Sequence, residues 1–411
     1  MNPLYNTGIA LYRFGARLAS MRIEKIATMV KGQQAAFDYL SRTLNRGHRY
    51  IWIHAASLGE FEQGRPLIEK IRSQYPDRKI LLTFFSPSGY EVRKNYDKVD
   101  AVCYLPFDTP ANARRFIDLA NPEMAIFVKY EFWGNYMQQL AKRNIPTYLI
   151  SAIFRKSQSF FKPLGGTFRN ILKCYTHIYV QDENSRQLLA GININNVTVA
   201  GDTRFDRVTD IMKTTVELPQ IAAFKATAKH IMIAGSSWEA DEAVYSQWLN
   251  NTNSVKAIIA PHEFDTHRLE QLQKAIPGSI LWSQIKDSTD VDFGNVRCII
   301  IDCFGLLASI YRYGNIAYIG GGFGAGIHNI NEAAVYGMPI IFGPRFDKFK
   351  EACDLTSLGG AFSIKSKEEF EQLMQSMSDE KITLSGNIAR QYIEQNIGAT
   401  DKIFADIFRR R

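Results

Sequence analysis

The sequence lacks the cysteine pattern of a secreted or zinc-binding protein. Its five cysteines, Cys103, Cys174, Cys298, Cys303 and Cys353, are odd in number and form no CxxC pair. Disulfide frameworks and structural zinc sites need paired or closely spaced cysteines. Scattered cysteines in a long chain are typical of reduced, mostly buried thiols, so we expect a cytosolic protein.

Long apolar runs are also absent. No run reaches the ~18–20 residues that a membrane-spanning helix needs. Arg13 and Arg17 interrupt the only apolar stretch that could form the core of a signal peptide. We therefore expect neither secretion nor a membrane span.

Acidic residues are scarce near the N-terminus. The 411 residues include 49 Lys and Arg against 41 Asp and Glu, a net charge of +8. Residues 1–50 hold eight basic residues and only two acids, so most of the excess lies there. A nucleic-acid-binding domain usually spreads its basic residues over one face. With no nucleic-acid-binding motif present, we expect no nucleic-acid partner.

Residues 1–32 alternate apolar side chains with five basic residues at roughly helical spacing. A basic amphipathic helix can insert its apolar face into an anionic leaflet, with its arginines on the headgroups. The same pattern suits a helix packed on the body of the protein. Both interpretations stay open, and residues 1–32 are a candidate membrane-associating segment.

What is present is the composition of a folded protein, 46% apolar, 12% aromatic and 22% charged. From residue 50 on, short apolar strands alternate with helices, which predicts an α/β fold with parallel sheets covered on both faces. The expected strands are 50–54, 79–85, 101–105, 124–129, 147–152, 177–181 and 197–200 in the first half, and 231–234, 255–260, 279–282, 296–301, 316–319 and 339–342 in the second.

This rhythm divides the chain into domains. We expect a Rossmann-like first domain at 33–208, a linker at 209–229 where strands are missing, and a second Rossmann-like domain at 230–385. The last residues, 386–411, are helical and could pack back across the domain boundary. Two doubly wound domains would face each other across a cleft at the carboxyl ends of their strands.

Glu60 is the first candidate catalytic residue. A strand ends at His54, a loop of small residues that includes Ser57 and Gly59 follows, and Glu60 lies where the next helix begins. The dipole of that helix favours an ionised carboxylate, which suits a general base that takes a proton from a sugar hydroxyl. A helix-capping glutamate without a catalytic role produces the same pattern, and the residues alone leave both possibilities open.

Glu131 is a second carboxylate at a strand end. It follows an apolar strand and precedes Phe132 and Trp133. Two carboxylates at the strand ends of one sheet form a candidate acid/base pair. The alternative is a surface ion pair between Lys129 and Glu131, with the aromatic side chains in the core.

Residues 151–180 contain five basic residues and no acid, interleaved with phenylalanines. The basic residues are Arg155, Lys156, Lys162, Arg169 and Lys173. A stretch that is both basic and apolar suits an amphiphile that bears phosphates better than it suits an uncharged sugar.

The second half contains a glycine-rich turn between Tyr313 and Pro344, which holds eight of the 28 glycines. A strand runs into Gly320–Gly322, then Gly324 and Gly326, and a helix opens near Asn331. Glycine N–H groups and a helix N-terminus can hold a phosphate, and Glu332 could accept from a ribose. No Gly-Lys-Ser/Thr follows, so this is not a Walker A loop.

The pattern for a bound metal is weak. Asp290–Val291–Asp292 matches the DxD of some sugar transferases, but it lies in a polar loop without converging oxygen ligands. The seven histidines show no metal-binding spacing. We expect no metal and no cofactor.

Six segments, in this order, resemble 3-deoxy-D-manno-octulosonic acid (Kdo) transferases of lipopolysaccharide synthesis. They are WIHAASLGEFE (52–62), KYEFWGNY (129–136), SAIFRKS (151–157), GDTRFDRV (201–208), IAGSSWEADE (233–242) and GIHNINEAAVYGMPIIFGP (326–344). The resemblance implies a GT-B glycosyltransferase fold with the acceptor in the first domain and the donor, CMP-Kdo, mainly in the second. It implies an inverting, metal-independent transfer to lipid A precursor (lipid IVA) at the cytoplasmic face of the inner membrane.

The resemblance also implies roles for residues. Glu60 is similar to the catalytic base and Glu131 to a second essential carboxylate. The predicted donor site combines residues of the glycine-rich turn with residues at two further strand ends of the second half. It consists of Ser236, Ser237, His262, Gly322, Gly326, His328, Asn329 and Glu332. The predicted acceptor site is Ser57, Gly59, Lys129, Arg155, Lys156 and Lys162. The family's Pro-Arg-His reads Pro261–His262–Glu263 here, so its arginine is missing, and the second glycine before His328 is replaced by Ile327.

Two other functions fit parts of the pattern. One is a GT-B enzyme that uses a different nucleotide sugar, such as a UDP-sugar or CMP-sialic acid. The other is a non-catalytic, nucleotide-binding membrane scaffold, against which the presence of both Glu60 and Glu131 argues.

Overall fold

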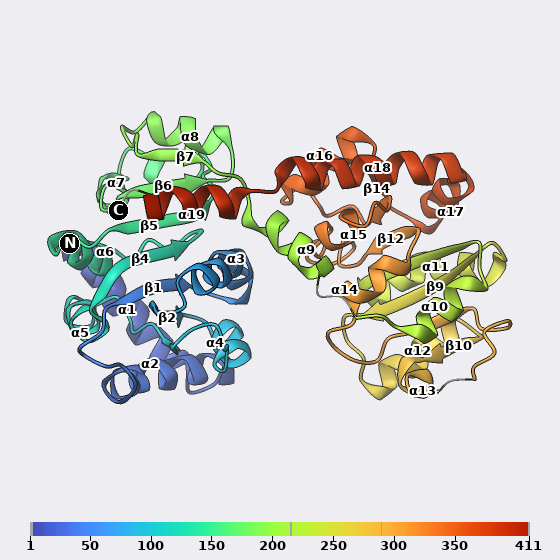
Figure 1. The fold of residues 1–411 in the computed structure, drawn as a ribbon, viewed down its shortest axis with the longest axis horizontal. Coiled ribbons are helices and arrows are strands. Elements are labelled where there is room, and N and C mark those ends of the chain that lie inside the picture. The colour runs from blue at the N-terminus through green and yellow to red at the C-terminus, as the bar shows by residue number, and fades with distance from the viewer. Residues whose placement is uncertain (1–2, 214–215, 289, 410–411) are drawn as a thin grey trace. The chain divides into compact units, whose positions relative to one another are not determined.

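The structure is a computed structural model that describes residues 3–213, 216–288 and 290–409. The described chain forms two compact units, one running up to Arg207 and resuming at Ile397, the other comprising Val208–Asn396. Each unit contains a sheet in which seven described strands pair in parallel (Figure 1). The predicted α/β fold with two parallel-sheet domains is confirmed.

The first sheet has the strand order β3-β2-β1-β4-β5-β6-β7. Its strands are β1 (Tyr50–Ala55), β2 (Lys79–Phe84), β3 (Ala101–Tyr104), β4 (Pro122–Val128), β5 (Thr147–Ala152), β6 (His177–Val180) and β7 (Val197–Val199). The intervening helices are α3 (Leu58–Gln74), α4 (Pro87–Arg93), α5 (Pro110–Ala120), α6 (Gly134–Lys142), η1 (Ser159–Phe161), α7 (Gly166–Leu172), α8 (Glu183–Ala190) and α9 (Thr203–Lys213).

Alternate side chains of these strands enter different cores. Along β1, Tyr50 and Trp52 pack with residues of α5 and α6, whereas Ile51 and Ile53 pack with residues of α3. Both faces of the sheet are therefore covered by helices, which explains why the strands read as continuous apolar runs.

The N-terminal segment forms two helices, α1 (Pro3–Ala19) and α2 (Glu24–Thr43), with residues 1–2 outside the described chain. The chain turns between them at residues 20–23. The Tyr5 hydroxyl of α1 donates to Asp108 at 2.6 Å and accepts from the Gly134 N–H at 2.9 Å. The start of α1 is thus fastened to the first unit.

The C-terminal helix α19 (Ala399–Arg409) also belongs to the first unit, where it packs on α3 (Figure 1). Asp406 accepts from the Tyr179 hydroxyl at 2.9 Å, and Ile403 and Ile407 are fully buried. The expected C-terminal segment 386–411 is therefore divided, because residues 386–396 lie in α18 (Asp379–Asn396) of the second unit, and 410–411 lie outside the described residues.

The second sheet has the order β10-β11-β9-β8-β12-β13-β14. Its strands are β8 (His230–Ser237), β9 (Val255–Pro261), β10 (Ser279–Leu281), β11 (Cys298–Ile300), β12 (Ile316–Ile319), β13 (Ile340–Phe342) and β14 (Ala361–Ser363). The remaining helices are α10 (Pro219–Ala226), α11 (Glu239–Asn251), α12 (Thr266–Ala275), α13 (Trp282–Ile285), α14 (Leu307–Ile310), η2 (Tyr311–Tyr313), α15 (Asn331–Ala334), α16 (Lys350–Leu358) and α17 (Lys367–Gln375).

Two segments differ from their predicted form. Residues 209–229, expected to be a linker, contain the end of α9 and all of α10, with 214–215 outside the described residues. Strand β14 was not predicted; it has only three residues, of which Ala361 alone is buried.

In each sheet the strand order reverses near the middle, and in the second sheet β10 and β11 are also exchanged at the edge. The reversal falls between β1 and β4 in the first sheet and between β8 and β12 in the second. Ligands of open α/β sheets bind at the carboxyl ends of the strands beside such a reversal. Glu60 follows β1 and Glu131 follows β4, while Ser236 ends β8 and the glycine-rich turn follows β12.

Candidate active site

Glu60 lies in the first turn of α3, directly after the loop that ends β1. Ser57 is the N-cap residue of this helix, and its hydroxyl donates to the Glu60 carboxylate. The side chain of Glu60 is half-buried, and Gly59 beside it is exposed. The carboxylate is thus held in place by one hydroxyl while it remains accessible, which is compatible with a base as well as with helix capping.

Glu131 has a much more enclosed environment. Its carboxylate is 5% exposed and lies 3.0 Å from His54 Nε2 and 2.5 Å from Trp133 Nε1. The backbone carbonyl of Glu131 accepts from the Tyr175 hydroxyl. Glu131 is therefore not in a surface pair with Lys129, and the alternative considered from the sequence does not hold.

His54 connects Glu131 to the interior of the sheet. In the tautomer that donates from Nε2 to Glu131, Nδ1 accepts from the Thr83 hydroxyl at 2.9 Å. The Thr83 oxygen in turn accepts from the Trp52 indole N–H at 2.8 Å. The sequence analysis did not identify His54 as a site residue. The sequence does contain a sign of this role, because His54 is a polar residue near the end of an otherwise apolar strand. In the sheet it pairs with Phe127, near the end of β4.

Tyr130 links Glu60 to the basic loop after β5. Burial raises the pKa of Tyr130, the positive charge of Arg155 lowers it, and the negative charge of Glu60 raises it. Glu60 and Arg155 thus influence the pKa of the Tyr130 hydroxyl with opposite signs. Tyr130 is a second residue that the sequence analysis missed, although it stands next to Glu131.

The backbone at this edge takes unusual conformations. Lys129, after β4, and Ser151, in β5, have φ angles of 69° and 52° although neither is glycine. Such left-handed residues persist where the surroundings hold them, and they cluster at functional sites. The Ser151 hydroxyl lies 2.8 Å from that of Thr203, which donates to the Gln63 carbonyl of α3 at 2.5 Å.

The other predicted acceptor residues are more exposed. Arg155, Lys156 and Lys162 are exposed on the segment between β5 and α7, and the Nζ of Lys129 lies 5.4 Å from the centre of the Tyr130 ring. Leu164 and Phe168, in the same segment, also expose apolar surface. The structure places Lys129 against the Tyr130 ring, and among the described residues no hydrogen bond or ion pair joins Arg155, Lys156 or Lys162 to Glu60.

In the second unit, Asp241 holds the glycine-rich turn against the end of β8. Its carboxylate accepts from the N–H groups of Gly321 at 2.8 Å and Trp238 at 3.0 Å, and from the Tyr318 hydroxyl at 3.1 Å. A Cβ atom on Gly320 would lie 2.1 Å from the Ser236 carbonyl oxygen, which explains the glycine there. Asp241 is a further residue that the sequence analysis missed.

Three rings stack beside this turn. The ring centres of Trp238 and His262 lie 4.4 Å apart, and those of His262 and His328 lie 4.7 Å apart. The Trp238 indole N–H donates to His328 Nε2 at 3.2 Å. Burial, and then the charge of His262, lower the pKa of His328 from its usual value of 6.5. His328 is therefore held in its neutral form, which can accept a hydrogen bond.

The two predicted serines of β8 differ in accessibility. Ser236 is half-buried with a φ of 53°, whereas Ser237 is 1% exposed and donates to Glu242 at 2.9 Å. Glu242 forms an ion pair with Arg268, and burial raises its pKa against the opposing charge of that arginine. The Ser237 hydroxyl is thus already used inside the protein, and Ser236 is the accessible one.

The end of the glycine-rich turn is more irregular than expected. The helix that follows, α15, has a single turn, so its dipole is weaker than that of the longer helix we expected. Asn329 donates to Glu332 at 3.0 Å, and Gly326 has a φ of 135° that only glycine adopts readily. Gly322 is buried, with its Cα against Gly343. A cation that contacts this turn is Arg345, which donates to the Gly324 carbonyl at 2.5 Å.

Within the described chain, no group of three or more His, Cys, Asp or Glu side chains could hold a metal ion. Asp292 accepts from the Gly294 N–H at 2.8 Å, and Asp290 is exposed. Over the same residues, no helix combines the length and the apolar character that a bilayer crossing requires.

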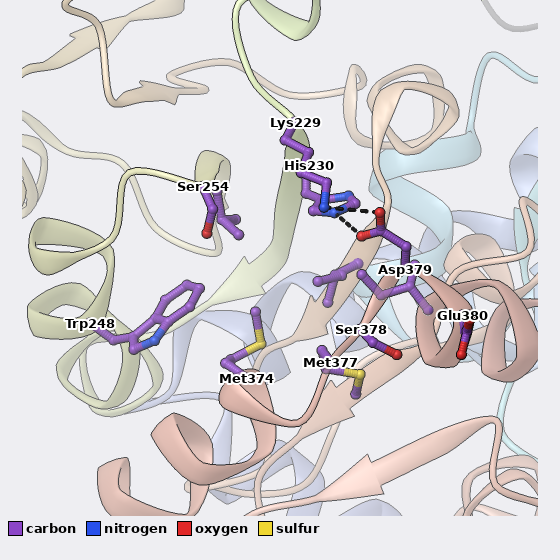
Figure 2. Close-up of a pocket in the computed structure, with 12 residues that line it drawn as sticks. Lys229, His230, Trp248, Ser254, Met374, Met377, Ser378, Asp379 and Glu380 are labelled. Carbon is purple, nitrogen blue, oxygen red and sulfur yellow. Dashed lines mark hydrogen bonds and ion pairs between the residues drawn. The ribbon is translucent and has the colours of Figure 1, made fainter.

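A cavity of about 490 Å³ lies at the opposite edge of the second sheet, where β8, β9 and β12 begin. Figure 2 shows Asp379 facing Lys229 and His230, with an ion pair of 2.9 Å to each, beside Trp248 and Met374. None of the predicted site residues lines this cavity. The strand-end residues, rather than this cavity, therefore define the candidate active site.

Comparison with known proteins agrees with this geometry. Residues 22–207 match the model of the family described as 3-deoxy-D-manno-octulosonic-acid transferase. A protein of that description from Rickettsia bellii is 26% identical over 334 residues, 80% of this chain and 79% of its own length. The one from Aquifex aeolicus is 25% identical over 327 residues, 78% of this chain and 83% of its own. MurG of Acinetobacter baumannii has a similar fold, with a TM-score of 0.54 and 13% identity, covering 88% of this chain and 100% of that one.

Two parallel-sheet domains of this kind, with MurG as a structural neighbour, define the GT-B fold. Residues 22–207 carry the Kdo transferase family domain, and relatives of that description align along most of the chain, so the chain is similar to Kdo transferases.

Proposed function

We propose that this enzyme transfers Kdo from CMP-Kdo to lipid A precursor (lipid IVA), with inversion at the anomeric carbon and without a metal. The first unit binds the acceptor and supplies the base, and the second unit binds the nucleotide. The observation that carries the proposal is an accessible Glu60 at the reversal point of the first sheet, in a chain similar to Kdo transferases.

In the proposed reaction an acceptor hydroxyl oxygen attacks the anomeric carbon of Kdo. As that bond forms, the bond from the anomeric carbon to the CMP phosphate oxygen breaks, and CMP leaves with the electron pair. The hydroxyl proton passes to the Glu60 carboxylate, which Ser57 orients by its hydrogen bond. One displacement by one base inverts the anomeric carbon and needs no covalent intermediate.

Glu131 supports this site as a buried partner of His54. A carboxylate that receives hydrogen bonds from an imidazole and an indole is held in one position. Lys129 and Arg155 lie at the same edge and supply positive charge for an acidic acceptor. Ser57, Gly59, Lys156 and Lys162 complete the proposed acceptor site.

The donor site proposed for the second unit consists of Ser236, Ser237, His262, Gly322, Gly326, His328, Asn329 and Glu332. Backbone N–H groups of a glycine-rich turn stabilise the phosphate charge that grows as CMP departs. A neutral His328, whose Nε2 accepts from Trp238, keeps its Nδ1–H to donate to an oxygen of the nucleotide. Arg345 contacts the turn and could take the place of the arginine missing before His262.

We further propose that residues 1–32 attach the enzyme peripherally to the cytoplasmic face of the inner membrane. In α1, Leu4 is 78% exposed, Leu11 67% and Leu18 53%. These leucines recur every seven residues and so share one face of the helix. Apolar side chains on one face, with arginines nearby, suit an interfacial helix.

The test is incubation of the whole chain with CMP-Kdo and tetraacylated lipid A precursor, followed by mass spectrometry of the lipid. The expected product is heavier by one or more Kdo residues, and the anomeric configuration is opposite to that of the donor. CMP-sialic acid and a UDP-sugar serve as alternative donors. Transfer from one of these instead of CMP-Kdo, or retention of configuration, would contradict the proposal.

A further inference from the structure

A cavity of about 270 Å³ lies in the first unit where α1 packs on α2 and α2 on α5. Figure 1 shows these three helices together at one end of the unit. Its walls include Arg13, Arg17, Gln33, Phe37, Phe107 and Arg115. A second cavity of about 310 Å³ shares Arg13 and Arg17. We refer to the first cavity, with these six residues, as the arginine pocket.

The positive charge of the arginine pocket is not compensated. Neither cavity has an acidic residue in its wall. Arg13, Arg17 and Arg115 form no ion pair with any described residue. Three guanidinium groups around one cavity repel each other, and an anion would remove that repulsion.

The carboxylate closest in sequence to the pocket wall is turned to other partners. Asp108 follows Phe107, but it accepts from the Tyr5 hydroxyl at 2.6 Å and from the N–H groups of Asn135 and Tyr136 at 3.0 Å. It is fully buried, and burial raises its pKa. Asp108 therefore fastens α1 to α6 and leaves the arginines available.

Arg115 is held in a defined orientation. Its Cζ atom lies 4.3 Å from the centre of the Phe37 ring, a cation–π contact. A guanidinium that stacks on a ring keeps the N–H groups at its edge free to donate. Planar, forked donors of this kind match the oxygens of a phosphate group.

Gln33 is the second, independent observation. Its side chain is 3% exposed, and neither its Nε2 nor its Oε1 has a hydrogen-bond partner. Buried amides are rarely left unpaired, because the lost hydrogen bonds to water are not replaced. Gln33 contributes to the pocket wall, so a small rotation of its side chain would let the covered amide N–H donate to a ligand oxygen there.

We propose that the arginine pocket binds the phosphate monoester of a lipid. A monoester carries up to two negative charges, which suits three arginines and one amide donor better than a singly charged diester does. The apolar walls, and the exposed leucines of α1 nearby, suit acyl chains. None of the acceptor residues named above belongs to the arginine pocket. The proposal rests on the proposed function in one respect, namely that the ligand is a lipid.

The test uses the full chain and measures flotation with phosphatidylcholine vesicles that contain either phosphatidic acid, a monoester, or phosphatidylglycerol, a diester. We expect preference for phosphatidic acid. Arg13→Gln, Arg17→Gln and Arg115→Gln should each lower that affinity about tenfold, the effect of losing one charge-assisted hydrogen bond. The control is Arg114→Gln, which removes the same charge from an exposed neighbour on α5 outside the pocket wall.

Gln33→Leu separates a ligand site from a structural role. This variant should unfold at a higher temperature than the wild type in phosphate-free buffer, because it removes the unpaired amide. It should also bind phosphatidic acid vesicles more weakly. If Gln33 binds the ligand, Gln33→Leu raises the unfolding temperature and weakens binding. If Gln33 has only a structural role, the substitution leaves binding unchanged.

Parallel measurements identify the source of the phosphate. Protection of the wild type against thermal unfolding by inorganic phosphate, lost in the arginine variants, would assign the site to phosphate itself. If the arginine variants bind tetraacylated lipid A precursor more weakly than the wild type, the pocket is assigned to the acceptor. If they lose affinity for phosphatidic acid alone, the pocket is assigned to a membrane lipid. Equal behaviour of the pocket variants and Arg114→Gln with every probe would overturn the proposal. Because no assay contains CMP-Kdo, failure here leaves the proposed transfer untouched.

Discussion

At the scale of single residues, Glu60 and Glu131 are two carboxylates of one sheet edge in different surroundings. Glu60 is half-buried with one hydroxyl partner, while Glu131 is enclosed between an imidazole and an indole. A base must meet the substrate, whereas a buried carboxylate with fixed partners positions its neighbours. The two surroundings favour Glu60 as the proton acceptor.

We expect Glu60→Gln to lower turnover by about 10²–10⁴-fold, the usual contribution of general-base assistance. Glutamine keeps the shape and the hydrogen bond to Ser57 but removes the basicity. The midpoint of thermal unfolding should change little, since a lost dipole interaction costs at most about 1 kcal/mol. Turnover is measured by mass spectrometry of the lipid product, with CMP-Kdo binding by calorimetry as the control. Retention of more than about a tenth of turnover would move the assignment to Glu131.

The His54–Glu131 contact can be measured by a double-mutant cycle. His54→Phe and Glu131→Gln should each lower the free energy of unfolding, and their effects should be non-additive by about 0.5–3 kcal/mol. The physical reason is that His54→Phe removes the imidazole from the Glu131 carboxylate, and Glu131→Gln removes the charge that strengthens the same hydrogen bond. Denaturant unfolding provides the energies, and the control cycle combines His54→Phe with Glu60→Gln. Additive effects in the first cycle would show that the contact contributes nothing.

His328 predicts a dependence of stability on pH. Burial and the charge of His262 lower the pKa of His328 in the folded protein, whereas in the unfolded chain this pKa is near 6.5. The folded protein therefore favours the neutral form of His328 more strongly than the unfolded chain does. The stability that this shift supplies is present above pH 6.5 and is lost as the pH falls. We expect the difference in unfolding temperature between wild type and His328→Gln to shrink from about pH 7.5 to pH 5. A constant difference would contradict the shift; His267→Gln, outside the stack, is the control.

At the scale of elements, α1 has two faces with separate tasks. Tyr5 and Asn6 bind the loop and helix around Asp108 and Asn135, whereas Leu4, Leu11 and Leu18 project apolar surface outward. Deleting the helix would therefore damage the first unit as well as any membrane contact. Substitution of the exposed face separates these effects.

We expect the combined variant Leu4→Ser, Leu11→Ser and Leu18→Ser to bind anionic liposomes more weakly than wild type while its unfolding temperature stays close. Added salt should weaken attachment further, because each basic residue near an anionic surface contributes about 1 kcal/mol. Sedimentation with liposomes measures the effect. Leu384→Ser, at an exposed leucine of α18 in the second unit, is the matched control. Unchanged binding of the triple variant would exclude α1 as the attachment element.

At the scale of the whole molecule, each unit repeats one arrangement. A parallel sheet reverses its strand order near the middle, and loops from the two strands beside the reversal approach each other. In the first unit these loops carry carboxylates, and in the second they carry glycines and stacked rings. One architecture thus carries the proposed base in one unit and the proposed phosphate-binding turn in the other.

We expect the complete enzyme to keep full activity in excess EDTA. CMP departs with a single phosphate, and backbone N–H groups of the glycine-rich turn can stabilise its charge. The measurement is the rate of Kdo transfer before and after chelation, with a magnesium-dependent glycosyltransferase as the assay control. Loss of activity that Mg²⁺ restores would redirect attention to Asp290 and Asp292.

The sequence predicted the elements more fully than their partners. Thirteen of the described strands match predicted ranges within a few residues, since alternating and continuous apolar runs are local features. The positions of Glu60 and Glu131 after β1 and β4 followed from the same pattern. Missed elements were β14, which is very short, and the turn that separates α1 from α2.

The amino-acid sequence by itself determined the α/β class, the two sheets and the family motifs, because each depends on residues close together in the chain. The tertiary structure alone decided which side chains meet. His54 and Glu131 are 77 positions apart, and Asp241 and Gly321 are 80 positions apart. Such pairs form only when sheet register and helix packing bring distant strand ends together. The unpaired amide of Gln33 became visible in the same way, because burial is a property of the folded chain.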